Sequence, residues 1–211
     1  MKNTNHSLFD KYEMIKDLGT GSSGSVMLVR HISMDQERAL KKVPKASAFA
    51  ESALSEARLL KSLEHPSIPR IFDFEEDDAF YYIVEEYIDG ETLDSFLLHQ
   101  QLISPGLFFN ICEQLCNVFI YLHTQISTPI IYRDLKPEHI IVCHNKLKLI
   151  DFGVSAYVIQ DGNNFNHYGN IEFSAPECFT EDTITPAADI YSLGQLLQYI
   201  LTFTPDSFSH K

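Results

Sequence analysis

Three glycines near the amino terminus have the spacing of a loop that can contact phosphate. Residues 17–29 read DLGTGSSGSVMLV, in which Gly19, Gly21 and Gly24 form the pattern G-x-G-x-x-G. Glycine lets the backbone approach a ligand closely and lets its N–H groups face an anion. A dinucleotide-binding turn would need a helix directly after the glycines, whereas residues 25–31 (SVMLVRH) are mostly β-formers. We therefore expect the tip of a β-hairpin, which either covers phosphates or is purely structural.

A lysine and a glutamate follow at regular intervals, and the lysine could bind phosphates if the glutamate holds its side chain in place. Lys41 lies fifteen residues after Val26, and Glu56 lies fifteen residues further on, in a segment rich in helix formers. Because a lysine side chain is long and flexible, a carboxylate on a packed helix would hold its ammonium group in place. The alternative for Lys41 is a solvated strand lysine, which is the interpretation that fits Lys42.

Further motifs occur in a fixed order along the rest of the chain. They are YRDLKPEH at residues 132–139, DFG at residues 151–153, SAPE at residues 174–177 and DIYSLG at residues 189–194. Together with the glycine loop, the strand lysine and the helix glutamate, they resemble the catalytic domain of a eukaryotic-type protein kinase. The resemblance extends from Tyr12 to Phe203. One motif alone would be weak, but the whole ordered set leaves little room for coincidence.

The resemblance implies ATP-dependent transfer of a phosphoryl group to Ser or Thr hydroxyls of protein substrates. Asp134 would be the catalytic base, and Lys136 would contact the transferred phosphate, as in Ser/Thr kinases rather than tyrosine kinases. Asp151 would hold Mg²⁺. His139 stands where the family has the asparagine that binds a second Mg²⁺. Because imidazole is a poor magnesium ligand but accepts softer ions such as Mn²⁺, we expect reduced activity or a changed metal preference.

The resemblance also implies a nucleotide site between two lobes. Leu18, Val26 and Ala39 would lie above the adenine. Ile141 would lie below it, and backbone groups from Glu86 to Ile88 would hydrogen-bond to the edge of the base. The full set of expected ATP-binding residues is Leu18, Gly19, Thr20, Gly21, Ser22, Ser23, Gly24, Ser25, Val26, Ala39, Lys41, Glu56, Glu86, Ile88 and Ile141.

The elements that would position these residues change in character near Asp89-Gly90. Strand patterns and one helix precede this point, and helices dominate after it. We expect an α+β, two-lobed protein-kinase-like fold in a single domain over residues 1–211. Its small β-rich N-lobe would cover residues 12–88, and a mainly helical, truncated C-lobe would cover residues 89–211. The expected helices are residues 47–64, 92–100, 104–125 and 190–203, and the expected hairpins are residues 70–88 and 139–153.

Two acidic residues in the second half have expected structural partners. Asp189 would brace the catalytic loop through its backbone, because a buried carboxylate without partners is costly. The chain ends at Lys211, soon after the helix that follows Asp189, so the family's later helices would be missing. Glu177 would then lack the arginine with which the family pairs it. A truncated gene, a minimal variant and a fragment completed by a partner that covers the shortened lobe all stay open.

The composition limits the kinds of partner. The chain has 211 residues, of which 45% are hydrophobic and 21% charged, as in ordinary globular proteins. A formal net charge of −13 argues against nucleic acid and acidic membrane surfaces as partners. No targeting segment is visible, and the four cysteines have no paired C-x-x-C spacing. We therefore expect a cytoplasmic protein with free thiols.

Two questions of function stay open. Residues 73–94 contain ten Asp or Glu and no Lys or Arg, which indicates either a solvated face or a surface that attracts basic substrate peptides. The chain could also be a nucleotide-binding scaffold with weak or no catalysis, because His139 departs from the family and residues 151–177 contain only Ser155 and Ser174 as Ser or Thr residues. A small-molecule phosphotransferase of similar fold is a second alternative, although SAPE favours a protein substrate.

Overall fold

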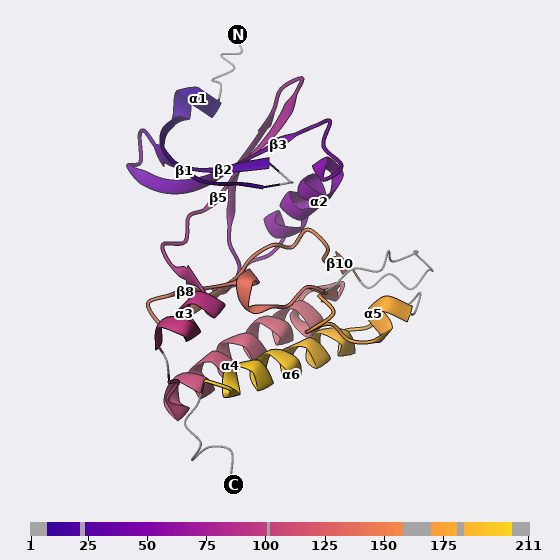
Figure 1. Ribbon diagram of the computed structural model, residues 1–211. Helices are drawn as coiled ribbons and strands as arrows, with labels where there is room; N and C mark the ends of the chain where they lie inside the picture. Colours follow the sequence, from indigo (N-terminus) through magenta and orange to yellow (C-terminus); the bar gives the residue numbers. More distant parts are fainter. Residues whose placement is uncertain (1–7, 22–23, 101, 158–169, 181–183, 204–211) are drawn as a thin grey trace. The chain divides into compact units, whose positions relative to one another are not determined.

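The computed structural model describes residues 8–21, 24–100, 102–157, 170–180 and 184–203 (Figure 1). They belong to two compact units, a first unit that contains a β-sheet and a second unit that is mainly helical. The predicted α+β class, with a β-rich part before a helical part, is confirmed. The units comprise Met1–Glu64 with Pro69–Tyr87, and His65–Ile68 with Ile88–Lys211.

The short segment His65–Ile68 groups with the second unit, although the sequence suggested a boundary after residue 88. Two hydrogen bonds explain this grouping. The Leu149 N–H donates to the Ser67 carbonyl oxygen at 2.8 Å, and Lys148 Nζ donates to the Ile68 carbonyl oxygen at 3.5 Å.

The first unit is built on a five-stranded antiparallel sheet with the order β1-β2-β3-β5-β4. One long helix, α2, accompanies the sheet, and a short helix, α1, precedes it (Figure 1). The helix predicted over residues 47–64 is α2, which ends before the proline at position 66 as expected. The elements are α1 (Leu8–Lys11), β1 (Tyr12–Gly21), β2 (Gly24–His31), β3 (Gln36–Pro44), α2 (Ala50–Lys61), β4 (Ile71–Glu76) and β5 (Phe80–Glu86).

Alternation along β3 decides which side chains meet α2. Leu40 belongs to a buried cluster with Leu8 of α1, whereas Val43 packs with Ala53 and Ala57 of α2. Because side chains of a strand point to opposite faces in turn, a residue two positions before Val43 shares its face. Position 41 is therefore directed toward α2.

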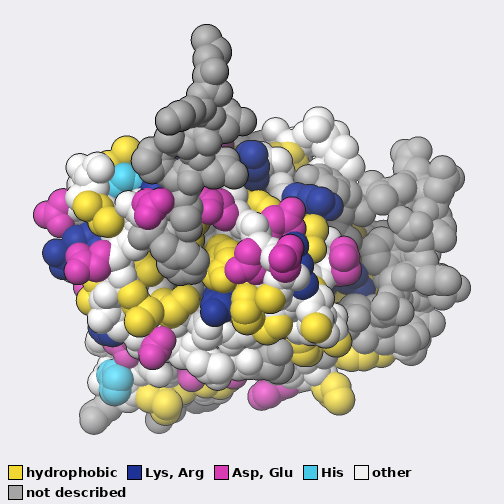
Figure 2. Space-filling view, turned by 90° about the horizontal axis from the view of Figure 1, so that it is seen from above, with side chains coloured by type: hydrophobic (Ala, Val, Ile, Leu, Met, Phe, Trp, Pro, Cys, Tyr) yellow, Lys and Arg dark blue, Asp and Glu magenta, His cyan; other side chains and the backbone are white. Residues whose placement is uncertain are grey.

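Part of the acidic run at residues 73–94 has structural contacts. Lys11 Nζ lies 2.9 Å from Asp73 Oδ2 and 3.2 Å from Glu75 Oε1, and these hydrogen bonds raise the pKa of Lys11. The Asp77 carboxylate accepts from the Ala79 and Phe80 N–H groups and from the Tyr82 hydroxyl. These hydrogen bonds lower the pKa of Asp77. In the view from above in Figure 2, acidic and basic side chains lie next to one another rather than in separate patches.

The second unit combines helices with short strands. α4 and α6 pack together, as Figure 1 shows, and β6, β8 and β9 form a three-stranded sheet. In the part of the chain that the structure describes, no helix has the length and apolar character needed to cross a membrane. The elements are β6 (Glu91–Thr92), α3 (Leu93–Gln100), α4 (Pro105–Ile120), η1 (Tyr121–Gln125), β7 (Ile130–Ile131), η2 (Pro137–His139), β8 (Ile140–Cys143), β9 (Lys146–Leu149), β10 (Ala156–Tyr157), α5 (Glu177–Thr180) and α6 (Ala187–Leu201).

The helix predicted over residues 104–125 is present but changes type before its end. It begins as expected at Ser104, whose Oγ accepts from the Leu107 N–H at 3.2 Å, with Pro105 in the first turn. The α-helix ends at Ile120, and a π-helical turn, η1, continues to Gln125. Such turns are rare and are often found near functional sites, and this one carries His123.

Candidate active site

The loop that contains the predicted catalytic residues is fixed by a buried carboxylate. Asp189 is fully buried near the start of α6. Its two oxygens accept from the N–H groups of Tyr132, at 2.8 Å, and Arg133, at 2.9 Å. His123 Nε2 on η1 lies 2.8 Å from Asp189 Oδ2. The predicted bracing of the loop by Asp189 is therefore confirmed. The contact with His123 had no signal in the sequence, because 66 positions separate the two residues.

The side chain of Tyr132, a residue of this loop, is buried and also makes polar contacts. Its ring is fully buried and meets the ring of Phe152 edge to face, with centroids 5.1 Å apart. Its hydroxyl donates to the Ile150 carbonyl oxygen, and its own carbonyl oxygen accepts from Ser155 Oγ at 3.1 Å. The hydroxyl contact, which ties the loop to the residue before Asp151, was not predicted.

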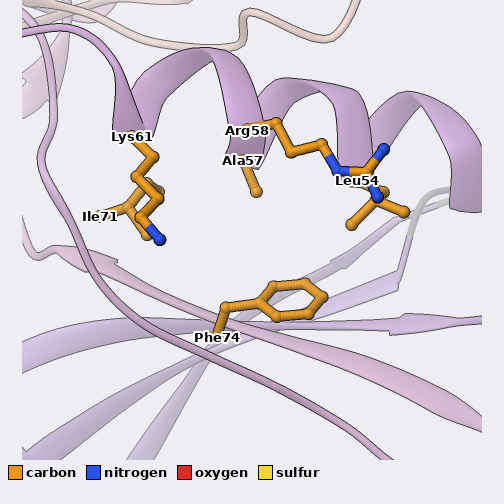
Figure 3. Close-up of a pocket in the computed structure, with 6 residues that line it drawn as sticks. All are labelled: Leu54, Ala57, Arg58, Lys61, Ile71 and Phe74. Atoms are coloured by element: carbon orange, nitrogen blue, oxygen red, sulfur yellow. The ribbon is translucent and has the colours of Figure 1, made fainter.

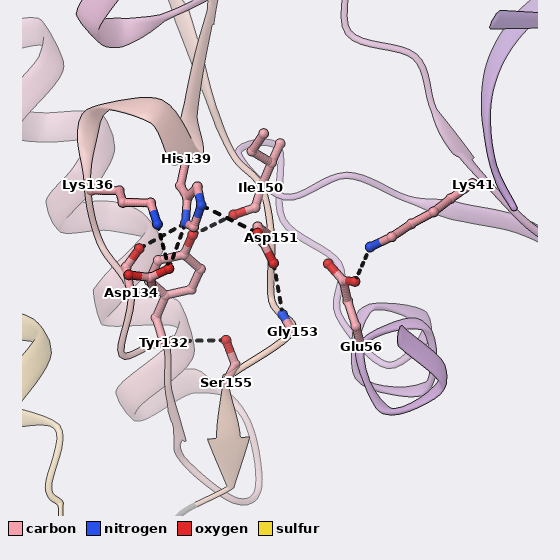
Figure 4. A network of polar contacts seen from close by, with 10 residues as sticks. All are labelled: Lys41, Glu56, Tyr132, Asp134, Lys136, His139, Ile150, Asp151, Gly153 and Ser155. Carbon is pink, nitrogen blue, oxygen red and sulfur yellow. Dashed lines mark hydrogen bonds and ion pairs between the residues drawn. The ribbon is translucent and has the colours of Figure 1, made fainter. Parts of the chain in front are cut away.

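Four predicted site residues of the second unit lie together (Figure 4). Lys136 Nζ is 2.9 Å from Asp134 Oδ2, and His139 Nδ1 is 3.4 Å from the same oxygen. His139 Nε2 is 3.4 Å from Asp151 Oδ2. The side chain of Asp151 is 53% exposed, whereas the side chains of Lys136, Asp134 and His139 are largely buried. The arrangement places two carboxylates, an ammonium group and an imidazole side by side, and the side chain of Asp151 is the most accessible of them.

The backbone at two positions in this cluster is strained. Arg133 and Asp151 have φ angles of 76° and 62°, in the left-handed region that residues other than glycine rarely adopt. Their surroundings hold them there, since Asp189 accepts from the Arg133 N–H and Asp151 Oδ1 accepts from the Gly153 N–H at 3.3 Å. Strain of this kind persists only where neighbouring contacts fix the backbone, and it is concentrated at functional sites.

In the first unit, the predicted pair of lysine and glutamate is present. Lys41 Nζ on β3 lies 2.6 Å from Glu56 Oε2 on α2, a contact also drawn in Figure 4. The side chains of Lys41 and Glu56 are only 19% and 7% exposed. Removing one member of a buried pair leaves an uncompensated charge, so both residues are needed to keep the site intact.

The glycine-rich stretch is the tip of a hairpin, as predicted. Gly21 of β1 pairs with Gly24 of β2, and Thr20 pairs with Ser25. Ser22 and Ser23, which were also predicted to bind ATP, lie outside the described residues. The stretch is thus not followed by a helix, and a dinucleotide-binding turn is excluded.

The glycines of the hairpin differ in the space that is available for a side chain. A Cβ atom at Gly24 would lie 2.2 Å from the Lys42 carbonyl oxygen, and the φ of Gly24 is 141°. At Gly19 and Gly21, a Cβ atom would meet no described atom beyond the chain neighbours within 4 Å. Packing therefore explains the glycine at position 24 but not those at positions 19 and 21.

We expect Gly24→Ala to lower the free energy of unfolding by more than about 1 kcal/mol, because its backbone and its neighbour both exclude a side chain. Gly21→Ala should change it by less than about 0.5 kcal/mol. Urea unfolding of both variants would check this. Equal losses of stability would contradict the distinction between the two glycines.

The residues predicted to surround the adenine are divided between the units. Val26 on β2 pairs with Lys41, and the buried Ala39 on β3 pairs with Leu28. Leu18 on β1 is 40% exposed. In the second unit, Ile141 lies on β8, where it pairs with Thr92.

The segment predicted to hold the edge of the base begins at Glu86, the last residue of β5. The Glu86 N–H already donates to the Arg70 carbonyl oxygen at 2.9 Å, so this N–H is not available to a ligand. The Ile88 carbonyl oxygen accepts from the Gly90 N–H at 3.1 Å.

A small cavity in the first unit lies apart from the Lys41–Glu56 contact. Its volume is about 170 Å³, and it lies between α2 and β4 (Figure 3). Apolar side chains line it, with the stems of two basic residues at its edge. None of the predicted site residues lines it, so it plays no part in the chemistry considered below. The lining residues are Leu54, Ala57, Arg58, Lys61, Ile71 and Phe74.

Comparison with known proteins gives one family and many relatives. The model of the protein kinase domain family matches residues 12–211. The serine/threonine-protein kinase PrkC of Bacillus subtilis is 31% identical over 201 residues, which are 91% of this chain and 30% of the relative. The serine/threonine-protein kinase ppk25 of Schizosaccharomyces pombe is 33% identical over 188 residues, 86% of this chain and 44% of the relative.

A third relative, the serine/threonine-protein kinase PknB of Mycolicibacterium smegmatis, is 30% identical over 215 residues, 96% of this chain and 34% of the relative. The chain spans less than half the length of each of these curated relatives.

Proposed function

The chain belongs to the protein kinase domain family, and on that premise we propose that it transfers the γ-phosphate of ATP to Ser and Thr hydroxyls of proteins. The observation that supports this most is the cluster formed by Asp134 and Lys136, on a loop braced by Asp189, with Asp151 from the segment after β9. A nucleotide-binding scaffold would have no need for a base and a cation 2.9 Å apart at this place.

The proposed reaction uses the groups of this cluster in distinct roles. The substrate hydroxyl oxygen forms a bond to the γ-phosphorus, the bond from that phosphorus to the bridging oxygen breaks, and ADP leaves. Asp134 accepts the proton of the hydroxyl group. The Lys136 ammonium group, held near Asp134, stabilises the negative charge of the phosphoryl group in transit. Positioning and charge stabilisation supply most of the rate in this class of reaction.

The first unit would supply the contacts to the nucleotide. The Lys41 ammonium group, held by Glu56, is suited to the upstream phosphates, because its orientation is fixed before the ligand arrives. The open space beside Gly19 and Gly21 suits close approach of a phosphate to the backbone.

A magnesium ion fits this site only in part. The exposed carboxylate of Asp151 is an oxygen ligand of the kind that Mg²⁺ prefers, and the ion would neutralise phosphate charge when bound. His139 offers nitrogen instead. In the described part of the chain, no three His, Cys, Asp or Glu side chains are grouped to hold a metal by themselves. Phosphate and water would therefore have to complete the coordination.

Support for Ser/Thr substrates comes from Lys136 and from the three relatives, which are all named serine/threonine-protein kinases. A preference for basic peptides has weaker support, since Asp73, Glu75 and Asp77 already have partners within the first unit. A cytoplasmic location and a partner that covers the second unit stay predictions from the sequence.

The proposal is tested by following the label of ATP. The protein is incubated with Mg²⁺ or Mn²⁺, a mixture of protein substrates, and ATP labelled at either the γ- or the α-phosphate. We expect label in protein from γ-labelled ATP only. Stabilisation of the protein by the nucleotide without transfer would instead support the scaffold, and label in small molecules would support the small-molecule phosphotransferase.

A further inference from the structure

We infer that His139 and Asp151 together bind one divalent transition-metal ion in the presence of nucleotide, and that the site thereby favours Mn²⁺ over Mg²⁺. The inference rests on the proposed function, because the nucleotide supplies further ligands. It deepens that function by assigning His139 a role in the choice of metal.

One ring nitrogen of His139 is committed to a hydrogen bond. Nδ1 lies 3.0 Å from the Asp134 carbonyl oxygen, and a carbonyl oxygen can only accept. Nδ1 must therefore carry the hydrogen, and the lone pair of the neutral ring is on Nε2. Histidines that bind metals nearly always hold their other ring nitrogen in this way.

The backbone of His139 is held as firmly as its ring. Its N–H donates to the Lys136 carbonyl oxygen at 3.0 Å, and its carbonyl oxygen accepts from the Ile150 N–H at 2.8 Å. The side chain is only 12% exposed. These contacts fix the direction of Nε2 without help from a ligand.

Nε2 faces the carboxylate of Asp151 across 3.4 Å (Figure 4). Two electron-pair donors at this distance repel each other unless a cation binds to both. Neighbouring ligands of one octahedral ion, each about 2.1 Å from it, lie about 3 Å apart. The separation of Nε2 from Oδ2 is close to that value, and the exposed carboxylate leaves room for the nucleotide's own oxygens.

The nitrogen ligand decides between metals. Mg²⁺ binds oxygen ligands in an octahedral arrangement and gives up its water reluctantly. Imidazole suits transition metals, and Mn²⁺ accepts oxygen ligands as well. The rival arrangement is a protonated His139 that forms an ion pair with Asp151, in which Nε2 cannot bind a metal.

The two arrangements differ in the environment of bound Mn²⁺. The protein, with its histidines labelled by ¹⁵N, is mixed with Mn²⁺ and a non-hydrolysable ATP analogue and studied by pulsed electron paramagnetic resonance. We expect a ¹⁵N coupling from a directly bound imidazole, which the unlabelled adenine cannot give. Mn²⁺ affinity is measured in the same samples.

His139→Asn should abolish the ¹⁵N coupling and lower the ratio of the Mn²⁺ affinity to the Mg²⁺ affinity about 10-fold or more, because an amide oxygen suits Mg²⁺ better than an imidazole nitrogen does. His144→Asn is the matched control, because His144 is exposed at the β8–β9 turn and its φ of 48° is one that asparagine tolerates. This control should retain both coupling and affinity.

Bound Mn²⁺ without a ¹⁵N coupling would overturn the inference and leave the proposed function intact. So would a metal preference that is unchanged in His139→Asn. If the wild-type protein binds neither nucleotide nor Mn²⁺, both the inference and the proposed function are contradicted.

Discussion

Asp134→Asn should lower kcat for phosphoryl transfer about 10²- to 10⁴-fold, the range expected when a positioned base is lost. Asparagine has nearly the same shape and retains an oxygen near Lys136, but it cannot accept the proton of the substrate hydroxyl group. Because Asp134 is not expected to contact the nucleotide, the affinity for ATP should stay within a few-fold. The measurement is steady-state transfer from γ-labelled ATP, together with nucleotide binding.

Asp78→Asn is the matched control for this variant, since Asp78 is exposed between β4 and β5. It removes the same charge from the chain at a place remote in sequence from the cluster, so it should leave kcat unchanged. Retention of more than a tenth of the wild-type kcat by Asp134→Asn would show that another group is the base.

Asp189→Ala should cause the largest loss of stability among the changes considered. The substitution leaves the buried N–H groups of Tyr132 and Arg133 without their acceptor and removes the contact to His123. Each buried N–H without a partner costs about 1–3 kcal/mol, so a loss of about 2–6 kcal/mol is expected. This is a large part of the 5–15 kcal/mol that is usual for a folded protein.

The loss can be measured by urea unfolding of the whole chain. Asp189→Asn keeps one oxygen acceptor and should be less destabilised, which gives a second value if the alanine variant does not fold. Asp78→Ala serves as control and should change the free energy of unfolding by less than about 0.5 kcal/mol. A loss below about 1 kcal/mol in Asp189→Ala would contradict the bracing role.

The parts of the fold that the sequence predicted correctly depend on local patterns or on motif order. The hairpin at the glycines was predictable because β-formers follow it, and the start of α4 because Ser104 and Pro105 form a helix cap. The contact of Lys41 with Glu56 followed from the strand position of one and the helical position of the other.

The parts that the sequence did not predict depend on contacts between distant positions. His123 meets Asp189 across 66 positions, and the hydroxyl of Tyr132 meets Ile150 across 18. No periodicity or short motif marks such contacts. The π-helical turn that presents His123 also has no signature in the sequence, because its residues, YLHTQ, would equally continue an α-helix.

The contacts of His139 give a physical meaning to its departure from the family sequence. The sequence identified it as a departure from the family and left reduced activity and a changed metal preference open. Its hydrogen bond to the Asp134 carbonyl oxygen and the direction of Nε2 toward Asp151 give a physical reason to favour the second.

The most direct test of the proposed activity identifies which amino acids receive the phosphate. Proteins labelled by the wild-type chain and by Asp134→Asn are hydrolysed, and their phosphoamino acids are separated. We predict phosphoserine and phosphothreonine from the wild-type chain and almost none from the variant. Label on tyrosine, or equal labelling by the two chains, would contradict the assignment of Asp134 as the base of a Ser/Thr protein kinase.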